Sequence, residues 1–460
     1  MTTHENAVQR ISIVGTGYVG LSTAVCFASR GCDVIASTRS HDKVRIINAK
    51  RAPFHEPGLD EAVRTSIESG HLRAEIDRSE VVRQTEVTFL TVGTPENADG
   101  TVDLRYVISA SEDIGRALKR KNAYHLVVVK STVTPGTVRG PVKAALEEAS
   151  GLVAGRDFGL CMNPEFLRQG SALRDTLHPD RVVIGEYDKR SGQRLAELLA
   201  GFYGPDIPIL RMSLESAEMI KYASNTFLAM KISYANEMAR ICELVPGVDV
   251  SNVMAGVGLD ERINPRFLNA GAGFGGSCLP KDTKALCKFA EAHGYSAPLL
   301  RATLAVNQAQ ASHVAQLALG TLGEPREKKV ALLGLSFKPD TDDLREAPSL
   351  TVARTLLNAG VHVSAFDPVV KQVSQPGFEG LEYPPSISAC LRGAHCCIVV
   401  TEWEQFKRLT PDDFTQSMET PAVVDARRIF DPHEFGNRLT FLAVGVGRDL
   451  DGGHASAGDE

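Results

Sequence analysis

The chain lacks the features that mark a nucleic-acid-binding, membrane-spanning or secreted protein. Its 50 Lys and Arg against 56 Asp and Glu give a net charge of −6, so it has no basic excess for a nucleic-acid partner. No uninterrupted apolar run reaches the roughly 18 residues that a membrane helix needs. Residues 1–10 are polar and lack the apolar stretch of a secretory signal. These absences predict a cytoplasmic protein without a nucleic-acid or membrane partner.

Cysteine pairs of the kind that bind zinc are also absent. The nine cysteines are odd in number and scattered, and no two are spaced as C-x-x-C, so we expect no structural zinc site and no other metal centre. Reduced thiols fit this pattern better than a disulfide framework. The adjacent Cys396 and Cys397 begin an apolar run, and we expect both in the core.

The chain is long enough for more than one hydrophobic core, and at 460 residues two or three domains are expected. Residues 1–205 alternate strand-like apolar runs with helical stretches, a pattern typical of a parallel sheet with helical crossovers. We therefore expect a nucleotide-binding α/β domain here, with a helix at 21–29. Its expected strands are 10–14, 33–36, 87–92, 126–129 and 182–184.

The pattern changes near residue 213. From there to about residue 244 the apolar residues follow helical spacing, and helical character is expected to continue, with a Gly-rich break at 271–276, to about residue 316. Residues 206–320 are thus predicted to be a helical segment that joins two α/β domains and carries a dimer interface. The second α/β domain is expected at 321–446 and a disordered, Gly- and Asp-rich tail at 447–460. The expected elements of the second domain are strands 329–333, 362–366, 397–401 and 422–425 and the helix 349–358.

A glycine motif follows the first predicted strand. Residues 15–20 read GTGYVG and open a helix, which is the arrangement of a dinucleotide-binding fingerprint. Gly15 permits the tight turn, Gly17 lets the backbone approach a pyrophosphate, and Gly20 lets the helix pack on the strand. Together with Val19, these glycines are predicted to bind the cofactor at the helix N-terminus. A tight turn without a ligand is the alternative.

One expected part of the fingerprint is missing. An acidic residue should end the second strand and bind the ribose hydroxyls of the cofactor's adenosine. Thr38 occupies that position here and Arg39 follows it. Loss of the carboxylate removes repulsion toward a 2′-phosphate, and an arginine can pair with one. NAD is the first expectation, NADP is an open alternative, and Thr38, Arg39 and Lys43 are predicted cofactor-binding residues.

A second glycine-rich segment, at 271–276, leads into a cysteine. Cys278 precedes a Pro that suits the first turn of a helix. A thiol at a helix N-terminus beside Lys281 is expected to have a lowered pKa and to act as a nucleophile. Asp282 lies four residues beyond the thiol as a proton acceptor or water organiser. An inert buried thiol is the usual alternative, which we assign to the other eight cysteines.

At this point the chain resembles a known family, the nucleotide-sugar 6-dehydrogenases that act on UDP-glucose or GDP-mannose. The resemblance covers about residues 9 to 430. It is carried by seven ordered motifs: GTGYVGL (15–21), VGTP (92–95), KSTVTPGT (130–137), NPEFLRQGSA (163–172), EMIKYASNT (218–226), GFGGSCLPKDTKAL (273–286) and GLSFKPDTDDLREAPS (334–349).

The resemblance implies a three-part fold, an α/β protein with two Rossmann-like domains joined by a long central helix. The first domain binds the nicotinamide cofactor, the helical segment forms a homodimer, and the last domain binds the sugar nucleotide. The implied reaction oxidises the C6 hydroxyl of the sugar to a carboxylate by two hydride transfers. Cys278 forms a thiohemiacetal and then a thioester, which water hydrolyses.

The resemblance also implies roles for individual residues. Lys221 and Asn225, four apart on one helix, stabilise negative charge on the C6 oxygen. Asp282 works through a water, and Glu165 assists thioester hydrolysis. Thr132 lies near the nicotinamide and the catalytic water. Further implied contacts are Thr94, Gln169, Lys281 and Arg345 with the cofactor, Glu165, Phe166, Leu167, Lys221, Asn225, Phe267, Leu268, Asn269, Ala270, Gly271, Gly275 and Lys338 with the substrate, and Arg262 with the active site of the neighbouring subunit.

Two residues depart from the family pattern. Thr38 stands where an acidic residue is usual, and Gln169 stands where many members carry Glu. Gln keeps hydrogen bonding but cannot act as a base, so Gln169 is given no acid–base role.

The substrate expected first is UDP-glucose, because HPDRVVIG (178–185) and the stretch 256–271 look closer to the enzymes that use it. GDP-mannose, TDP-glucose and a UDP-N-acetylhexosamine stay open within the class. Two other classes are a catalytically silent nucleotide-sugar sensor and a one-step hydroxyacid dehydrogenase. The sensor would have lost Cys278, and the one-step enzyme would reduce one cofactor per substrate.

Overall fold

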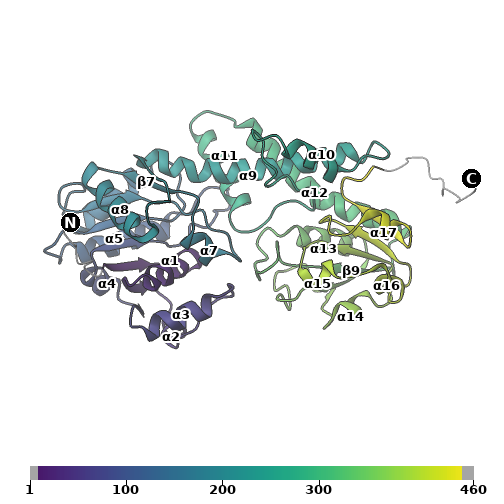
Figure 1. Cartoon of the computed structure of the whole chain (residues 1–460), viewed down its shortest axis with the longest axis horizontal. Helices are drawn as coiled ribbons and strands as arrows, with labels where there is room; N and C mark the ends of the chain where they lie inside the picture. The colour runs from purple at the N-terminus through teal and green to yellow at the C-terminus, as the bar shows by residue number, and fades with distance from the viewer. Residues whose placement is uncertain (1–8, 448–460) are drawn as a thin grey trace, which may run out of the picture. The chain divides into compact units, whose positions relative to one another are not determined.

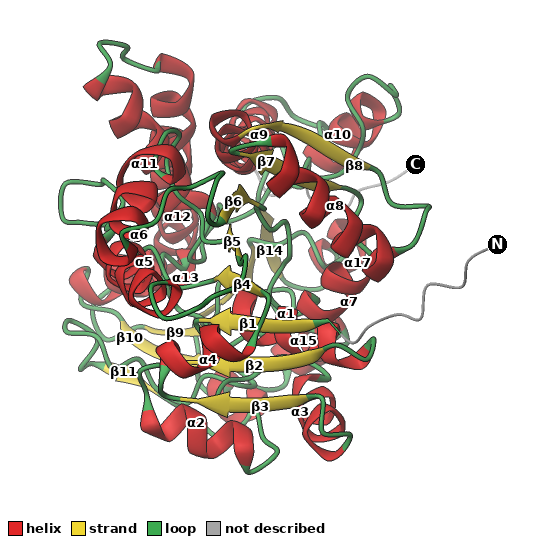
Figure 2. Cartoon of the chain, turned by 90° about the vertical axis from the view of Figure 1, so that its left-hand side faces the viewer, coloured by secondary structure: helices red, strands yellow, loops and turns green. Residues whose placement is uncertain are grey.

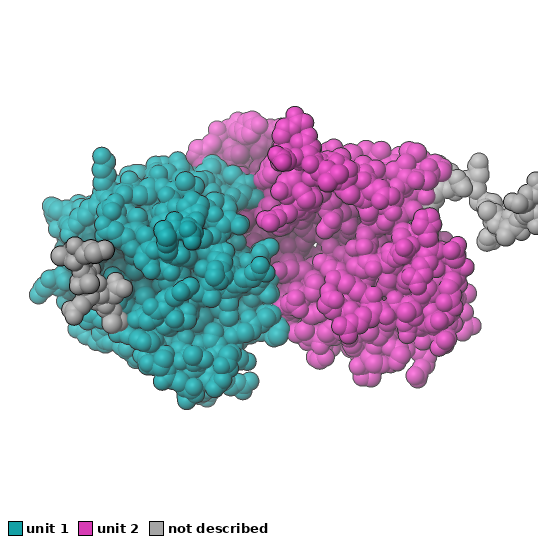
Figure 3. Space-filling model, viewed as in Figure 1, with its two compact units in different colours: residues 1–224 teal, residues 225–460 magenta. Residues whose placement is uncertain are grey.

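The computed structural model describes residues 9–447, and the chain divides into two compact units, 1–224 and 225–460 (Figure 3). Each unit contains one sheet covered by helices. The expected tail, apart from Gly447, and most of the polar N-terminal stretch lie outside the described residues. No helix of residues 9–447 is long and apolar enough to cross a membrane.

The sheet of unit 1 has eight strands in the order β3-β2-β1-β4-β5-β6-β7-β8. Figure 2 shows β3, β2, β1 and β4 side by side. The strands β1, β4, β5 and β6 are buried almost throughout, as expected of a sheet covered on both faces. The strands are β1 (Arg10–Val14), β2 (Asp33–Ser37), β3 (Leu72–Glu75), β4 (Val87–Leu90), β5 (Leu126–Val129), β6 (Gly159–Met162), β7 (Val182–Glu186) and β8 (Ile209–Ser213).

Two details of the unit 1 sheet differ from the sequence expectation. The pair β6–β7 is antiparallel, although an all-parallel sheet was predicted. Strands β3, β6 and β8 were not predicted; β3 and β8 contain polar or exposed residues. The helices are α1 (Tyr18–Ser29), α2 (His41–Asn48), α3 (Leu59–Glu68), α4 (Arg78–Gln84), α5 (Arg105–Leu118), the π-helical turn η1 (Val138–Val142), α6 (Lys143–Ser150), α7 (Ala172–Leu177) and α8 (Lys189–Tyr203).

The long helix predicted from about residue 213 is α9 (Leu214–Cys242), the element on which unit 1 ends and unit 2 begins (Figure 1). Three more helices follow it: α10 (Val250–Gly258), α11 (Leu279–Ala292) and α12 (Pro298–Leu322). The expected break at 271–276 was too short, since the whole stretch 259–278 is non-helical. Glycines at 271, 273, 275 and 276 and the proline at 265 explain why no helix forms there.

The sheet of unit 2 has the order β11-β10-β9-β12-β13-β14, with every pair parallel. This is the strand order 3-2-1-4-5-6 of a dinucleotide-binding fold. Cys396 and Cys397 are fully buried in β12, as predicted. The elements are β9 (Lys329–Leu333), α13 (Pro348–Asn358), β10 (His362–Phe366), β11 (Leu381–Glu382), α14 (Ile387–Leu391), β12 (Cys396–Val399), α15 (Glu404–Lys407), α16 (Pro411–Thr415), β13 (Ala422–Asp425), α17 (Pro432–Gly436) and β14 (Thr440–Ala443).

Candidate active site

The glycine fingerprint forms the turn between β1 and α1. Gly15 has a φ of +112°, which favours glycine. A Cβ on Gly20 would stand 1.8 Å from the carbonyl oxygen of Gly15, whereas nothing lies within 4 Å of a Cβ position on Gly17. Gly20 therefore serves helix–strand packing, and exposed Gly17 opens α1 with free space beside it. This geometry fits the pyrophosphate of a dinucleotide.

The other predicted site residues of unit 1 follow the carboxyl ends of neighbouring strands. Thr38 and Arg39 follow β2, Thr94 follows β4, Thr132 follows β5, and residues 165–169 follow β6. Because the carboxyl ends of parallel strands meet at one edge of a sheet, this is where α/β folds bind ligands. Lys43 lies in the first turn of α2, where its backbone N–H donates to Ser40 Oγ (3.3 Å).

A buried charge cluster connects α9 with the loops after β5 and β6. Lys221 Nζ lies 2.8 Å from Glu165 Oε1, and both side chains are less than a tenth exposed. Glu165 Oε2 also accepts a hydrogen bond from the backbone N–H of Leu167 (2.7 Å). Lys221 lies 5.6 Å above the ring of Phe166. The cluster holds a carboxylate and an ammonium in a site shielded from water.

A second lysine belongs to this cluster and was not assigned from the sequence. Lys130, the residue after β5, donates from Nζ to Asn163 Oδ1 (2.9 Å) and is buried. Burial lowers its pKa to about 8, Glu165 opposes this shift, and Lys221 adds to it. The predicted motifs contained Lys130 and Asn163, but only the fold shows that their side chains meet.

Cys278 differs from the other cysteines. All nine lie within the described residues, and eight of them are buried whereas Cys278 is exposed. Cys278 is the N-cap residue of α11, and Pro280 stands in the first turn as predicted. Its carbonyl oxygen accepts from the N–H of Asp282 (2.8 Å), and its Sγ lies 3.5 Å from Ser277 Oγ. The positive end of the α11 dipole stabilises a thiolate at this place.

Asp282 lies in the first turn of α11, four residues after Cys278. It is 1% exposed. One carboxylate oxygen accepts from Asn225 Nδ2 (2.6 Å), and the other from Lys281 Nζ (2.5 Å). Asn225 stands one helical turn after Lys221 on α9, so their side chains share a face of that helix. The predicted residues Asn225, Lys281 and Asp282 are thus brought together.

The glycine-rich loop 271–276 packs tightly against other parts of unit 2. A Cβ on Gly275 would lie 2.3 Å from the carbonyl oxygen of Glu346, and one on Gly276 would lie 2.8 Å from the ring of Phe337. From the sequence we expected these glycines to admit a ligand. In the structure, the space beside Gly275 and Gly276 is filled by the backbone of Glu346 and the ring of Phe337. These two glycines therefore allow close packing within unit 2.

Three side-chain amides that the sequence did not single out hold this loop: those of Asn236 and Gln310 are buried, and that of Asn307 is half-buried. Asn236 on α9 accepts from the N–H of Gly271 (2.8 Å), and Gln310 on α12 donates to the oxygen of Gly271 (2.8 Å). Asn307 accepts from the N–H of Phe274 (2.7 Å) and donates to its oxygen (3.0 Å). A polar residue inside a helix gives no sequence signal of such a partner, which is why these residues were missed.

The remaining predicted residues of unit 2 lie on loops. Arg262 is highly exposed and pairs with Asp260. Arg345 forms a fork with Asp343 between β9 and α13, the loop that also contains Lys338. In the stretch 267–270, Leu268 and Ala270 are buried, Phe267 is half-buried and Asn269 is exposed. Phe267 has a φ of +67°, which costs backbone strain in a non-glycine residue.

No group of three or more His, Cys, Asp or Glu side chains within residues 9–447 is arranged to hold a metal ion. Gln169 lies in the loop after β6, whose neighbours Gly170 and Ala172 donate their backbone N–H groups to the buried Glu56 (2.8 Å each). Glu56 was not predicted as part of this region.

Three family profiles match the chain in succession. All describe the UDP-glucose/GDP-mannose dehydrogenase family: its NAD binding domain matches residues 9–203, its central domain residues 215–309, and its UDP binding domain residues 331–432.

Individual relatives match over most of their length. A UDP-glucose 6-dehydrogenase of Haloferax volcanii is 42% identical over 91% of this chain and 96% of its own. A GDP-mannose 6-dehydrogenase of Azotobacter vinelandii is 43% identical over 81% of this chain and 84% of its own. Among solved structures, a UDP-glucose dehydrogenase from Pyrobaculum islandicum superposes with a TM-score of 0.88, at 39% identity, over 97% of this chain and 100% of that one.

Proposed function

Because the chain belongs to the UDP-glucose/GDP-mannose dehydrogenase family, we propose that it oxidises the C6 hydroxyl of a nucleotide-diphosphate sugar to a carboxylate through a covalent intermediate on Cys278. It is a nicotinamide-dependent oxidoreductase of that family. The observation that supports the covalent route is the single exposed thiol at the N-terminus of α11, with all other cysteines buried.

A nicotinamide dinucleotide fits the first sheet. The open space beside Gly17, the N-terminus of α1 and the turn at Gly15 would hold its pyrophosphate. Thr94, Thr132 and Gln169 would contact it from the loops after β4, β5 and β6, and we assign Lys281 and Arg345 to it as well. When bound, the cofactor accepts the hydride that leaves C6 in each of two oxidation steps.

The thiol of Cys278 makes the second oxidation possible. The first step converts the C6 alcohol to an aldehyde, which is reluctant to lose another hydride. Addition of the thiolate to the aldehyde carbon forms a C–S bond and gives a thiohemiacetal, whose loss of hydride gives a thioester. Water then attacks the thioester carbonyl, the C–S bond breaks, and a carboxylate and the free thiol result. Two cofactors are reduced for each sugar.

The surrounding side chains would stabilise charge and move protons. Lys221 and Asn225, one turn apart on α9, would stabilise negative charge on the C6 oxygen. Asp282 would take a proton through a water, and its bond to Asn225 orients that amide. Glu165 would assist hydrolysis of the thioester, and its contact with Lys221 orients it. Thr132 would help to place the water.

UDP-glucose is the proposed substrate and UDP-glucuronate the product. UDP-glucose 6-dehydrogenases are prominent among the similar proteins, and the third profile describes a UDP binding domain. A GDP-mannose 6-dehydrogenase and a UDP-D-ManNAc dehydrogenase are also similar. GDP-mannose and a UDP-N-acetylhexosamine are therefore alternatives, and TDP-glucose stays open from the sequence. We assign Phe166, Leu167, Arg262, residues 267–271, Gly275 and Lys338 to binding of the sugar nucleotide.

The test is the number of reduced cofactors formed per sugar consumed, measured with UDP-glucose and each alternative sugar nucleotide. Two per sugar in the wild type, with no carboxylate product in Cys278→Ser, supports the proposal. Cys287→Ser, at a buried cysteine on the same helix, is the control and should keep the activity. One cofactor per sugar, or full activity of Cys278→Ser, would overturn the covalent route.

A further inference from the structure

The end of β2 carries an arginine where dinucleotide-binding folds usually carry an acid. Arg39 follows Thr38, whose Oγ accepts from the N–H of Ser40 (3.4 Å). In unit 2, the strand in the equivalent place of the sheet, β10, is followed by Asp367, which accepts several hydrogen bonds. The acid is therefore kept at one of the two strand ends in this chain and lost at the one beside the glycine fingerprint.

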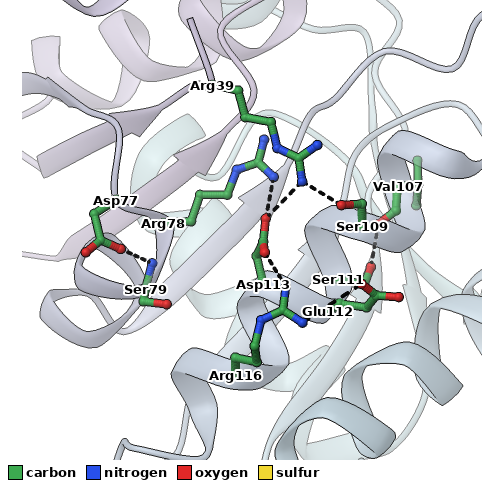
Figure 4. A network of polar contacts seen from close by, with 10 residues as sticks. All are labelled: Arg39, Asp77, Arg78, Ser79, Val107, Ser109, Ser111, Glu112, Asp113 and Arg116. Atoms are coloured by element: carbon green, nitrogen blue, oxygen red, sulfur yellow. Dashed lines mark hydrogen bonds and ion pairs between the residues drawn. The ribbon is translucent and has the colours of Figure 1, made fainter. Parts of the chain in front are cut away.

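Arg39 belongs to a cluster of basic side chains that was not visible in the sequence (Figure 4). Its guanidinium donates to Ser109 Oγ (2.5 Å) and to Asp113 Oδ2 (3.2 Å). Arg78 donates to the same oxygen (2.8 Å), and Arg116 donates to Oδ1 of Asp113 (2.5 Å). Arg78 is the first residue of α4, the helix that follows β3, and β3 is the strand next to β2.

The cluster has more positive than negative charge. Three guanidinium groups share Asp113, and within residues 9–447 the only other carboxylate paired with any of them is that of Glu112, 3.9 Å from Arg116. Burial alone would raise the pKa of Asp113, but hydrogen bonds from Arg78, Arg116 and Arg39 outweigh it, so this pKa is lowered. Asp113 is therefore a carboxylate at neutral pH, and one positive charge remains unbalanced.

Arg78 is the buried member of the cluster. Its side chain is 10% exposed, and its Nε is buried without a hydrogen-bond partner among the described residues. Burial and the nearby charge of Arg39 disfavour the charged form of Arg78, while Asp113 favours it. Two guanidinium groups held this close repel each other, and an added anion would relieve that repulsion.

We infer that the cofactor site of this chain is built for the 2′-phosphate of an NADP-type dinucleotide, with Arg39 as the contacting residue and Arg78, Asp113 and Ser109 as the residues that position it. The inference rests on the nicotinamide-binding site of the proposed function and extends it to the adenosine ribose. Arg39 is 58% exposed at its side chain, so it can meet a ligand, and its planar fork matches a phosphate.

The neighbouring groups favour the same ligand. Thr38 removes the carboxylate that would repel a phosphate. Ser40 is the N-cap residue of α2, so the helix N-terminus and Lys43 add positive potential next to Arg39. Asp113 weakens this potential but fixes the guanidinium in place, which reduces the entropy lost on binding. A cluster that served only as a structural ion pair would not make a ligand with a 2′-phosphate bind more tightly than one with a 2′-hydroxyl.

The first experiment compares the binding of 2′,5′-ADP and 5′-AMP to the purified full-length protein by calorimetry. These probes differ in the 2′-phosphate and need no sugar and no turnover. We expect 2′,5′-ADP to bind at least about tenfold more tightly, with an affinity that falls as salt is raised. Equal or weaker binding of 2′,5′-ADP would overturn the inference.

Substitutions then test which residue is responsible for the tighter binding of 2′,5′-ADP than of 5′-AMP. Arg39→Ala should lose roughly 10- to 100-fold in affinity for 2′,5′-ADP and change little for 5′-AMP. The control is Arg45→Ala, an exposed arginine on α2 paired with Asp42, which should keep both affinities. Asp113→Asn should weaken the binding of 2′,5′-ADP less than Arg39→Ala does. An unchanged preference in Arg39→Ala would remove Arg39 from the site.

Kinetic measurements distinguish a failure of the cofactor inference from a failure of the proposed function. With an oxidisable sugar nucleotide, the ratio of kcat/KM for NADP to that for NAD should exceed one and should reverse in the double variant Thr38→Asp, Arg39→Val. If no sugar nucleotide is oxidised, the proposed function fails while the binding comparison still decides the phosphate site. If sugars are oxidised with NAD alone, the inference fails and the proposed function stands.

Discussion

At the scale of single residues, the charged groups of unit 1 share partners inside the fold. Glu165 contacts Lys221, and the buried Lys130 lies near enough to both that their charges affect its pKa. Two ammonium groups and one carboxylate in a dry site leave an excess of positive charge, which suits stabilisation of a developing oxyanion. The depressed pKa of Lys130 also makes the stability of the protein depend on pH.

We predict that Lys130 contributes to the free energy of unfolding only at alkaline pH. Its pKa is about 8 in the folded protein against 10.5 in the unfolded chain, so the unfolded state binds more protons between these values. The free energy of unfolding should rise with pH across this window, by about 3 kcal/mol at most, and this contribution is lost as pH falls through 8.

Denaturant unfolding of the wild type and of Lys130→Met at several pH values between 7 and 10.5 measures this effect. The difference between the two proteins should change across the window, while Lys119→Met, at an exposed lysine, should track the wild type. A pH-independent difference between wild type and Lys130→Met would contradict the prediction.

A second residue-scale prediction concerns Asp282. Asp282→Asn removes a proton acceptor and the charge that holds Asn225 and Lys281. We expect kcat to fall by roughly 10²- to 10³-fold with a smaller change in KM, because the group acts in the chemical steps. Glu291→Gln, at a carboxylate further along α11 that pairs with Lys288, is the matched control. Steady-state kinetics with a saturating cofactor measures both, and a loss confined to KM would argue against this role.

At the scale of elements, Gly17 and Gly20, which belong to the same turn, have different roles. Gly20→Ala would place a methyl group 1.8 Å from the carbonyl oxygen of Gly15, whereas Gly17→Ala meets nothing within 4 Å. We predict that Gly20→Ala destabilises unit 1 by about 3 kcal/mol, the upper end of the usual cost of overpacking, because the clash is with backbone. Gly17→Ala should change stability by under about 1 kcal/mol but weaken cofactor binding, since the methyl group occupies the space for the pyrophosphate.

Thermal unfolding with and without cofactor distinguishes the two variants. Gly17→Ala should melt near the wild-type temperature without cofactor, and added cofactor should raise its melting temperature less than that of the wild type. Gly20→Ala should melt at a lower temperature than the wild type in both conditions. If Gly17→Ala kept its full response to cofactor, the fingerprint would have to be interpreted as a turn alone.

At the scale of the whole molecule, helix α9 has an apolar face that the chain itself leaves exposed. Phe227, Tyr234 and Ile241 are spaced seven residues apart, so they lie on one side of the helix, and each is about half exposed. Such a face is typical of an interface. We propose that residues 206–320 form a homodimer and that Arg262 reaches the active site of the second chain.

Light scattering should show a particle of two chains for the wild type and of one chain for the double variant Phe227→Glu, Tyr234→Glu. The role of Arg262 is tested by co-expressing Arg262→Ala with Cys278→Ser, each inactive alone. Mixed dimers then contain one complete site, so activity should return to roughly a quarter of the wild-type value. Continued absence of activity in the mixture, with dimers present, would contradict the shared site.

The sequence by itself determined the class of the fold, and it predicted most of the residues that we assign to the candidate site. The first strand, β5, β9, β10 and β13 appear within the predicted bounds, because short runs made mostly of apolar residues are typical of buried strands in a covered sheet. The glycine fingerprint and the exposed Cys278 at the start of α11 could be predicted since a turn, a cap and a proline are local signals.

Only the tertiary structure decided which side chains meet across the sequence. The reversal of β7, the non-helical length of 259–278 and the amides that hold the glycine loop depend on packing between distant elements. The cluster of Arg39, Arg78 and Asp113 joins residues 35 to 74 positions apart, and no periodic pattern records such a distance. Local conformation is set by neighbours along the chain, whereas charge pairing and burial are set by neighbours in space, and here these decide which cofactor we expect the site to prefer.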